Sequence, residues 1–553
     1  MIGLPVIQRE FSGLLRTRRA VVVLVSLSVS LAALMIARWP SDGLVDLAGV
    51  HSQQTFQVIA FGMTAAVALL VPVFPATSMV HERRKGTLAL LLNSTLGPVA
   101  IFAGKLIAML GFVVLLLAVT LPAVSACHAL GGLSFRDEIL PLYLVLGLAS
   151  VEFTAWGLLV STRATTTDGA VRATFGGVLT LTLLALIPHY FLQGSEGNLA
   201  TLASVIRNVS PVPAIMQIAG QSDPASAGLL SQVDHVTEFV IASLAVSFAC
   251  AFLTIRQLAS PLLDRARSQG VITDDRTTGM RTLRRLLYLV DPQRRKSGIP
   301  PFVNPVLIKE FRCRQFGRSH WLMRLVALCA LVSLTLAYAA TLGSEEWGVE
   351  TIGAIIVTMQ VGLVVLFAPG ISAGLISSER ESGGWELLRA TPLSPGRIVR
   401  GKLMSVVWTL VLLLMATLPG YGVMIWIKPV LREQIAQVMI CLSLTALFAA
   451  MLSATVSSFF RRTAPATVTS YSLLLGLWGG SLLIWLGRDA PFGFSTVQAA
   501  LTLNPMAAAL SVIRTSGFES YDLVPANWWM MGGGSAVLFL ILTLQTWRLT
   551  KPE

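Results

Sequence analysis

The sequence contains little charge. Only 12% of its 553 residues are Asp, Glu, Lys or Arg, whereas 54% are hydrophobic. A soluble protein has about 25% charged residues, so this chain has about half the usual number available for a water-facing surface. The scarcity excludes an ordinary soluble enzyme and a disordered chain. It is typical of a protein whose surface faces a lipid bilayer.

Cysteine is also scarce, and the few present are far apart. Their number is odd and no C-x-x-C motif occurs, so the sequence predicts neither a disulfide framework nor a zinc site. We expect them to be small apolar fillers. The five are Cys127, Cys250, Cys313, Cys329 and Cys441.

Signatures of catalysis are missing as well. No H-E-x-x-H and no G-x-S-x-G motif occurs. The segment 396–403 nearly fits a phosphate-binding loop, but Leu403 stands where the Mg²⁺-binding Ser or Thr is required, and no strand precedes it. We therefore expect no enzymatic activity and no cofactor bound by this chain.

Long apolar stretches, by contrast, are abundant. Twelve are long enough to cross a bilayer. The first follows Arg16, Arg18 and Arg19 without a convincing cleavage site, which indicates an uncleaved signal anchor. The twelve run over 20–37, 56–79, 106–130, 139–161, 171–192, 236–254, 321–342, 351–376, 403–427, 435–459, 464–487 and 527–547.

Lys and Arg are concentrated on one side of these predicted spans. With the N-terminus inside, 34 of the 41 Lys and Arg fall on inner segments, against 12 of the 28 Asp and Glu. Because positive residues mark cytosolic loops, both termini are predicted to be cytosolic. The net charge of +13 is thus explained by topology, and no nucleic-acid partner is expected.

The segment 256–303 is a basic cytosolic linker. Within it, residues 280–290 mix Leu with paired Arg, a pattern that favours a helix lying in the membrane interface. Attraction to anionic lipid headgroups explains these charges, so membrane lipids are expected partners.

An internal repeat divides the chain on either side of this linker. Residues 82–106 and 379–403 are identical at 11 of 25 positions without a gap, and the segment 5–11 recurs at 305–311. The sequence therefore predicts an all-α integral membrane protein of twelve helices in two tandem six-span halves, 1–255 and 304–553. Because six is even, both halves have the same orientation, related by an axis along the membrane normal.

The best-matched part of the repeat is the predicted cytosolic loop after the second span of each half. Acidic and basic residues stand where the span ends, a Gly and a short helix follow, and a Gly-Lys pair begins the next span. One alternative is a juxtamembrane helix anchored by its charges; gap-free retention in both halves favours a docking surface. The candidate residues are Glu82, Arg83, Gly86, Lys105, Glu379, Arg380, Glu381, Gly383 and Lys402.

The second copy, SERESGGWELLRATPLSPGRIVRGKL, resembles the signature loop of permease subunits in the type-2 ATP-binding-cassette exporter family. The first copy matches less well, since Arg84 replaces the second Glu of the motif. The segments before the first and seventh spans resemble the family's interfacial helix, and Ile7, Phe11 and Leu14 share one helical face there. Pro-containing segments before the sixth and twelfth spans resemble its outer re-entrant helices.

The resemblance implies a permease, and more specifically an exporter, in a bacterial cytoplasmic membrane. Two copies of a separate ATPase subunit would bind ATP and Mg²⁺ and dock on the loops after spans 2 and 8, which would form cytosolic coupling helices. The transported substrate is not indicated. Alternatives are a major-facilitator-like secondary transporter and a non-transporting membrane scaffold. About 24 residues between spans 2 and 3, and a single intramembrane acid, argue against the secondary transporter.

That acid is Glu152, within the fourth predicted span. A carboxylate near the bilayer centre costs at least about 2.5 kcal/mol, so we expect it to face the bundle or a cavity. Functionally it could contact a cationic substrate, carry a proton or bind a lipid headgroup. Structurally it could be neutral and hydrogen-bonded to Thr154 or to a neighbouring helix.

Overall fold

The regular structure is entirely helical in the described part of the chain. The computed structural model describes residues 4–16, 18–38, 50–94, 96–164, 166–186, 188–189, 198–220, 234–259, 304–313, 327, 331, 349–488, 492–515 and 517–550. Within these ranges ten helices are long and apolar enough to cross a membrane, or up to twelve if each of two bent pairs is one span. The prediction of an all-helical, multi-pass membrane protein is confirmed at this level.

Every predicted span but one coincides with a helix. The exception is 321–342, of which only residues 327 and 331 are described, and the interfacial helix predicted at 280–290 lies outside the described residues. The chain divides into two compact units, one of residues 1–265 with 479–500 and the other of residues 266–478 with 501–553. The linker predicted at 256–303 begins within the last turn of α12 (His235–Ala259), and its residues 260–303 lie outside the described part.

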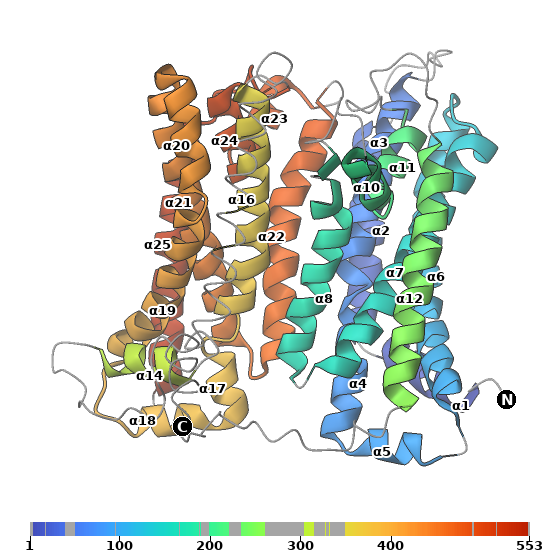
Figure 1. The fold of residues 1–553 in the computed structure, drawn as a ribbon, viewed down its shortest axis with the longest axis horizontal. Coiled ribbons are helices and arrows are strands. Elements are labelled where there is room, and N and C mark those ends of the chain that lie inside the picture. Colours follow the sequence, from blue (N-terminus) through green and yellow to red (C-terminus); the bar gives the residue numbers. More distant parts are fainter. Residues whose placement is uncertain are drawn as a thin grey trace. The chain divides into compact units, whose positions relative to one another are not determined.

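Unit 1 contains the helices of the N-terminal half (Figure 1). They are α1 (Leu4–Leu15), α2 (Arg18–Arg38), α3 (Val50–Leu70), α4 (Val73–Arg84), α5 (Thr87–Leu92), α6 (Pro98–Ala129), η1 (Phe135–Ile139), α7 (Leu140–Arg163), α8 (Thr167–Thr182), η2 (Leu184–Leu186), α10 (Asn198–Arg207), α11 (Pro211–Ile218) and α12 (His235–Ala259).

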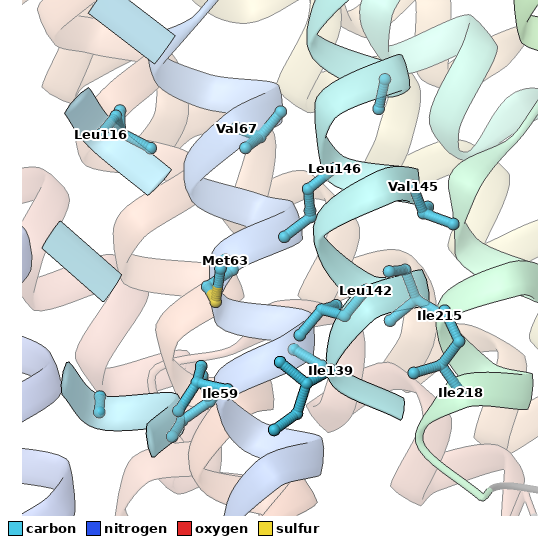
Figure 2. Packing of buried hydrophobic residues seen from close by; sticks show 14 of the residues in the cluster. Ile59, Met63, Val67, Leu116, Ile139, Leu142, Val145, Leu146, Ile215 and Ile218 are labelled. Carbon is cyan, nitrogen blue, oxygen red and sulfur yellow. The ribbon is translucent and has the colours of Figure 1, made fainter. Parts of the chain in front are cut away.

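The core of unit 1 is formed where α3, α6, α7 and α11 meet (Figure 2). Ile59 and Met63 of α3 lie beside Leu142 of α7 and are almost fully buried. Other apolar side chains, such as Phe248 on α12, are exposed. Apolar residues on both the inside and the outside are what a helix bundle in lipid requires, because lipid tails are as apolar as the core.

Unit 2 contains most helices of the C-terminal half. They are α14 (Pro305–Cys313), α16 (Val349–Ser372), α17 (Ser377–Ser382), α18 (Gly384–Arg389), α19 (Pro395–Met415), α20 (Leu418–Ile427), η5 (Pro429–Leu431), α21 (Arg432–Phe459), α22 (Thr463–Leu486), α23 (Phe494–Leu501), α24 (Pro505–Ile513) and α25 (Ala526–Thr550). Residues 479–500, from the end of α22 and from α23, group with unit 1 instead.

Sharp bends occur where sequence analysis expected interfacial or re-entrant segments. Helix α1 meets α2 at 61°, and α23 meets α24 at 109°. Asn504 caps α24 by accepting from the N–H groups of Met506 and Ala507, and Pro505 occupies its first position, where a missing N–H costs nothing. With 12 residues, α1 is about 18 Å long, too short by itself for a bilayer core of about 30 Å.

Candidate functional site

An ion cluster surrounds a fully buried lysine in unit 1. Lys105 of α6 has 0% exposed side-chain surface, and its Nζ lies 2.9 Å from Glu10 of α1 and 3.2 Å from Glu82 of α4. It also donates to the Ser78 hydroxyl at 2.8 Å. Arg9 donates to both carboxylates, at 2.8 Å to Glu10. The cluster thus joins the N-terminal helix to the candidate loop and to the span that follows it.

Unit 2 contains the same cluster at corresponding positions. Lys402 of α19 donates to Glu310 of α14 at 2.5 Å and to Glu379 of α17 at 3.1 Å. Lys309 donates to Glu379 at 2.8 Å. These residues occupy the repeat positions of the unit 1 cluster. The same arrangement of charges is therefore formed twice, once in each half of the sequence.

The charges in each cluster balance. Two cations face two carboxylates, which is the condition under which a buried lysine can stay charged. Burial alone would raise the pKa of Glu10, but the charge of Lys105 and the hydrogen bond from Arg9 outweigh it, so the pKa of this carboxyl lies below its ordinary value. Both lysines at the centre are shielded from water, whereas Arg9 and Lys309 are 53% and 42% exposed.

Arg83 and Arg380 bind the end of a neighbouring span. Arg83 donates to the carbonyl oxygens of Thr162 and Ala164, at 2.5 and 3.0 Å, where α7 ends. Arg380 donates to two carbonyl oxygens at the end of α21, at 3.2 and 3.4 Å. The last carbonyls of a helix lack partners within it, so each arginine satisfies groups that otherwise need water.

Gly86 and Gly383 turn the chain from the span into the short helix. Their φ angles are +72° and +76°, in the left-handed region that favours glycine. A Cβ at either position would meet nothing within 4 Å. The glycines are therefore needed for backbone conformation and not for close packing.

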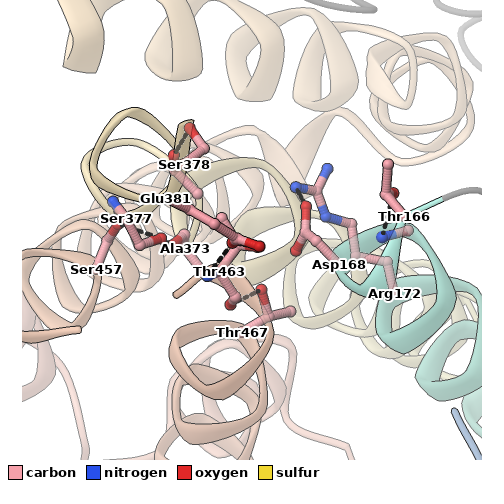
Figure 3. Close-up of polar contacts among 12 residues, drawn as sticks. Thr166, Asp168, Arg172, Ala373, Ser377, Ser378, Glu381, Ser457, Thr463 and Thr467 are labelled. Atoms are coloured by element: carbon pink, nitrogen blue, oxygen red, sulfur yellow. Dashed lines mark hydrogen bonds and ion pairs between the residues drawn. The ribbon is translucent and has the colours of Figure 1, made fainter. Parts of the chain in front are cut away.

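Glu381 makes a contact that has no counterpart in the first loop. Its carboxylate accepts hydrogen bonds from the N–H and the hydroxyl of Thr463, at 2.9 and 2.7 Å (Figure 3). It therefore caps the N-terminus of α22, where a negative charge is favourable. The first loop has Arg84 at this position, and α8 is capped by its own Thr166, which accepts from the N–H of Gly169 at 3.1 Å.

The short helices that follow the glycines bury one face and expose the other. In α5, Leu88 is 4% exposed and packs among apolar residues with Leu91 and Leu92. Leu90 is 72% exposed, and Leu387, its counterpart in α18, is 76% exposed. Each short helix therefore presents one leucine outward at the same repeat position.

Helix α18 has an additional anchor. Trp385 is buried, and its indole N–H donates to the Leu549 carbonyl at 3.2 Å, near the end of α25. The corresponding residue of the first loop is Leu88, whose side chain has no N–H group to donate. This contact with α25 is therefore specific to the second loop.

Within each half, the structure thus brings the predicted loop residues of that half close together, and it pairs the charged ones with groups of the same half. Their part in coupling stays a prediction. Sequence reasoning did not single out Glu10, Glu310 or the exposed leucines. The internal repeat could have identified Glu10 and Glu310. Each lies in the motif shared by 5–11 and 305–311, and the lysine that it contacts is repeated as well.

Glu152 lies apart from the two clusters, in the middle of α7. Its side chain is 0% exposed, so it faces the bundle as expected and contacts no solvent-filled space. Thr154 donates its hydroxyl to the Ser150 carbonyl.

No protein-family model matches the chain, and no curated protein is similar enough to it to count as a relative. The resemblance of the repeated loops to an exporter family therefore remains the basis for a proposal.

Proposed function

We propose that this chain is the permease of an ATP-binding-cassette exporter, with two tandem six-span halves of the same orientation. The observation that carries the proposal is the outward leucine on a firmly anchored short helix, present in both repeated loops. Lys and Arg counts put these loops and both termini in the cytosol. The membrane is a bacterial cytoplasmic membrane, as the resemblance implies.

The exposed leucines are the proposed contacts with the ATPase. An apolar side chain on a water-facing loop loses the hydrophobic contribution of burial, about 25 cal/mol per Å², and a partner surface would recover it. Glu386, beside Leu387, is also 71% exposed and supplies a polar rim. One such helix in each half suits two ATPase subunits, which would bind the ATP and Mg²⁺.

The buried ion clusters are the proposed mechanical link. Each lysine holds the loop to an interfacial helix, α1 or α14, and to the span that begins after the loop. A force on the short helix would therefore move these elements as one body. Closure of two docked ATPase subunits would then move the spans attached to these loops and alternate access to a transport pathway.

In this proposal the predicted loop residues have two kinds of role. Glu82, Lys105, Glu379 and Lys402 hold the loop rigidly, and Gly86 and Gly383 direct the short helix. Arg83, Arg380 and Glu381 fix the loop to the ends of other spans. Only the leucines and their exposed neighbours would contact the ATPase. Glu82 and Glu379 would then affect coupling indirectly, through the position of the short helix.

The test is co-purification of the full-length chain with an ATP-binding-cassette ATPase identified by mass spectrometry, together with ATP hydrolysis by the complex. Leu90→Asp and Leu387→Asp should each weaken association, and the double variant should abolish both association and stimulated hydrolysis. Leu387→Met is the matched control, because it keeps an apolar side chain and should retain the complex. Thermal unfolding should be unchanged in all variants.

Retention of the ATPase by the double Asp variant would refute docking through these leucines. Failure of the wild-type chain to bind any such ATPase would refute the permease proposal itself. Transport without ATP would then favour the secondary transporter, and no transport would favour the scaffold.

A further inference from the structure

Glu152 is a buried carboxyl group without a hydrogen-bond partner. It has no exposed surface, and neither of its oxygens accepts a hydrogen bond within the described residues. A carboxylate ion in this position would lose its hydration without compensation, which costs several kcal/mol or more. The neutral acid avoids most of that cost.

The polar groups that face Glu152 come from one side of α12, the helix packed along α7. They are Ser243 and Cys250, and Ser247 lies between them, on the same face at helical spacing. The Ser243 hydroxyl donates to the Leu148 carbonyl at 3.4 Å and also lies within hydrogen-bonding reach of Glu152. The buried Ser247 hydroxyl has no partner in the described part of the chain.

No charged group among the described residues stands close enough to compensate an ionised Glu152. Arg83 binds the Thr162 carbonyl, ten residues along α7 and therefore about 15 Å away. Lys105 belongs to the same cluster as Glu82, at that end of the bundle. Helices α3 and α11 present no charged side chain. The other charged residues of η1, α7, α8 and α12 lie near the ends of these elements, away from the middle of α7. They are Arg136, Asp137, Glu138, Arg163, Asp168, Arg172, Glu238 and Arg256.

We propose that Glu152 is a proton-binding site, in which the protonated carboxyl donates to the Ser243 oxygen and accepts from the Ser247 hydroxyl. This arrangement uses the Ser247 hydrogen and a Ser243 lone pair, and it leaves the Ser243 hydrogen on the Leu148 carbonyl. An ionised carboxylate has no proton to donate, so it could bond to Ser243 only by taking that hydrogen from the Leu148 carbonyl. The ligand is a proton and not a metal ion, because a side chain with no exposed surface leaves no path for a hydrated cation.

The bound proton holds α7 against α12. Release of the proton leaves a charge between the helices, so the contact opens and water enters. The site therefore couples proton release to separation of two spans within unit 1. This inference rests on α7 and α12 alone and is independent of the proposed ATPase partner.

The test compares the full-length wild type with Glu152→Gln in lipid nanodiscs. Thermal unfolding is measured from pH 4 to pH 10, and the infrared band of the protonated carboxyl is recorded at each pH. Wild type should show the band at neutral pH and lose stability as the pH rises, by up to about tenfold in the folded-to-unfolded ratio per pH unit. Glu152→Gln should lack this band and this dependence, and Glu238→Gln, a partly exposed acid on α12, should retain both.

Two further measurements keep the proposal falsifiable if Glu152→Gln does not fold. Ser247→Ala should shift the carboxyl band to higher frequency, because the C=O group loses its donor. Sodium at constant pH should leave wild-type stability unchanged. Absence of the band in the wild type, or stabilisation by sodium but not by choline, would overturn the proton site, and the sodium result would assign the carboxylate to a metal cation.

Discussion

The loop between α4 and α5 and the loop between α17 and α18 are built alike but anchored differently. Both have a buried lysine with two carboxylates, an arginine on the end of a span and a left-handed glycine. Only the second adds Glu381 on the N-terminus of α22 and Trp385 on the end of α25. These two contacts of the second loop are made by residues that differ from their counterparts Arg84 and Leu88 in the first loop.

The difference indicates which interactions the loop needs and which are additions. The contacts present twice hold the loop to α1 or α14 and to the spans on either side of the loop. The contacts present once tie the second loop to two more helices. We therefore expect equal effects where the loops agree and unequal effects where they differ.

The largest effect is expected from removing the buried lysines. Lys402→Met leaves Glu310 and Glu379 buried without their shared cation, which should cost about 3–5 kcal/mol. Lys105→Met should cost less, because Glu10 is 22% exposed whereas Glu310 is 3% exposed. Thermal unfolding of the full-length chain measures both. Neutralising both carboxylates in the Lys402→Met background should restore much of the loss, and no recovery would contradict the charge argument.

The second-largest effect is expected at Glu381 and its counterpart Arg84, and it should distinguish the two loops most clearly. Glu381→Ala removes the cap of α22 and should cost about 1 kcal/mol. Arg84→Ala changes an exposed side chain at the corresponding position and should cost much less. Glu381→Asp is the conservative control. Equal losses for Glu381→Ala and Arg84→Ala would show that the asymmetry of the loops has no energetic consequence.

Substitution of the turn glycines should give equal effects in the two loops. Gly86→Ala and Gly383→Ala each place a Cβ on a left-handed residue, which costs about 1–2 kcal/mol, while neither Cβ meets a neighbour. Gly97→Ala is the control, since Gly97 has extended backbone and open space around it. Unfolding midpoints measure all three, and a large difference between Gly86→Ala and Gly383→Ala would contradict a shared turn.

The smallest effect concerns pH and the unit 1 cluster. Because the pKa of Glu10 lies below its ordinary value of 4.5, its contribution to stability is complete above that value. The contribution is lost as the pH falls through the lower, folded-state pKa. Glu10→Gln should therefore make stability less dependent on pH below about 4.5, as measured by unfolding between pH 3 and pH 6. If the dependence of stability on pH below about 4.5 is the same in Glu10→Gln as in the wild type, Glu10 is not an ionised member of the cluster.

Much of the fold could be predicted because lipid imposes a simple rule on the sequence. Long apolar stretches marked every described span. The glycines at 86 and 383 were also visible, because a residue retained at a turn often has a special backbone angle. Exact helix ends were less predictable: the second span continues to Arg84, beyond the predicted limit at 79.

The candidate site could be predicted only in part. The repeat located the loops, but the Glu-Arg pattern does not say what the carboxylates contact. Glu82 and Glu379 follow an apolar span and could equally have faced water. Their partners Arg9 and Lys309 are about 70 residues away in sequence, and such contacts have no local pattern.

The sequence by itself determined the helical membrane class, the positions of the described spans and the place of the repeated loops, because hydropathy and internal identity are properties of local composition. Only the tertiary structure decided that Lys105 and Lys402 are buried at the centre of ion clusters, that Leu90 and Leu387 point outward, and that Glu152 faces hydroxyl groups without a cation. These features depend on which helices pack together, and packing is fixed by shape and charge across segments far apart in the chain.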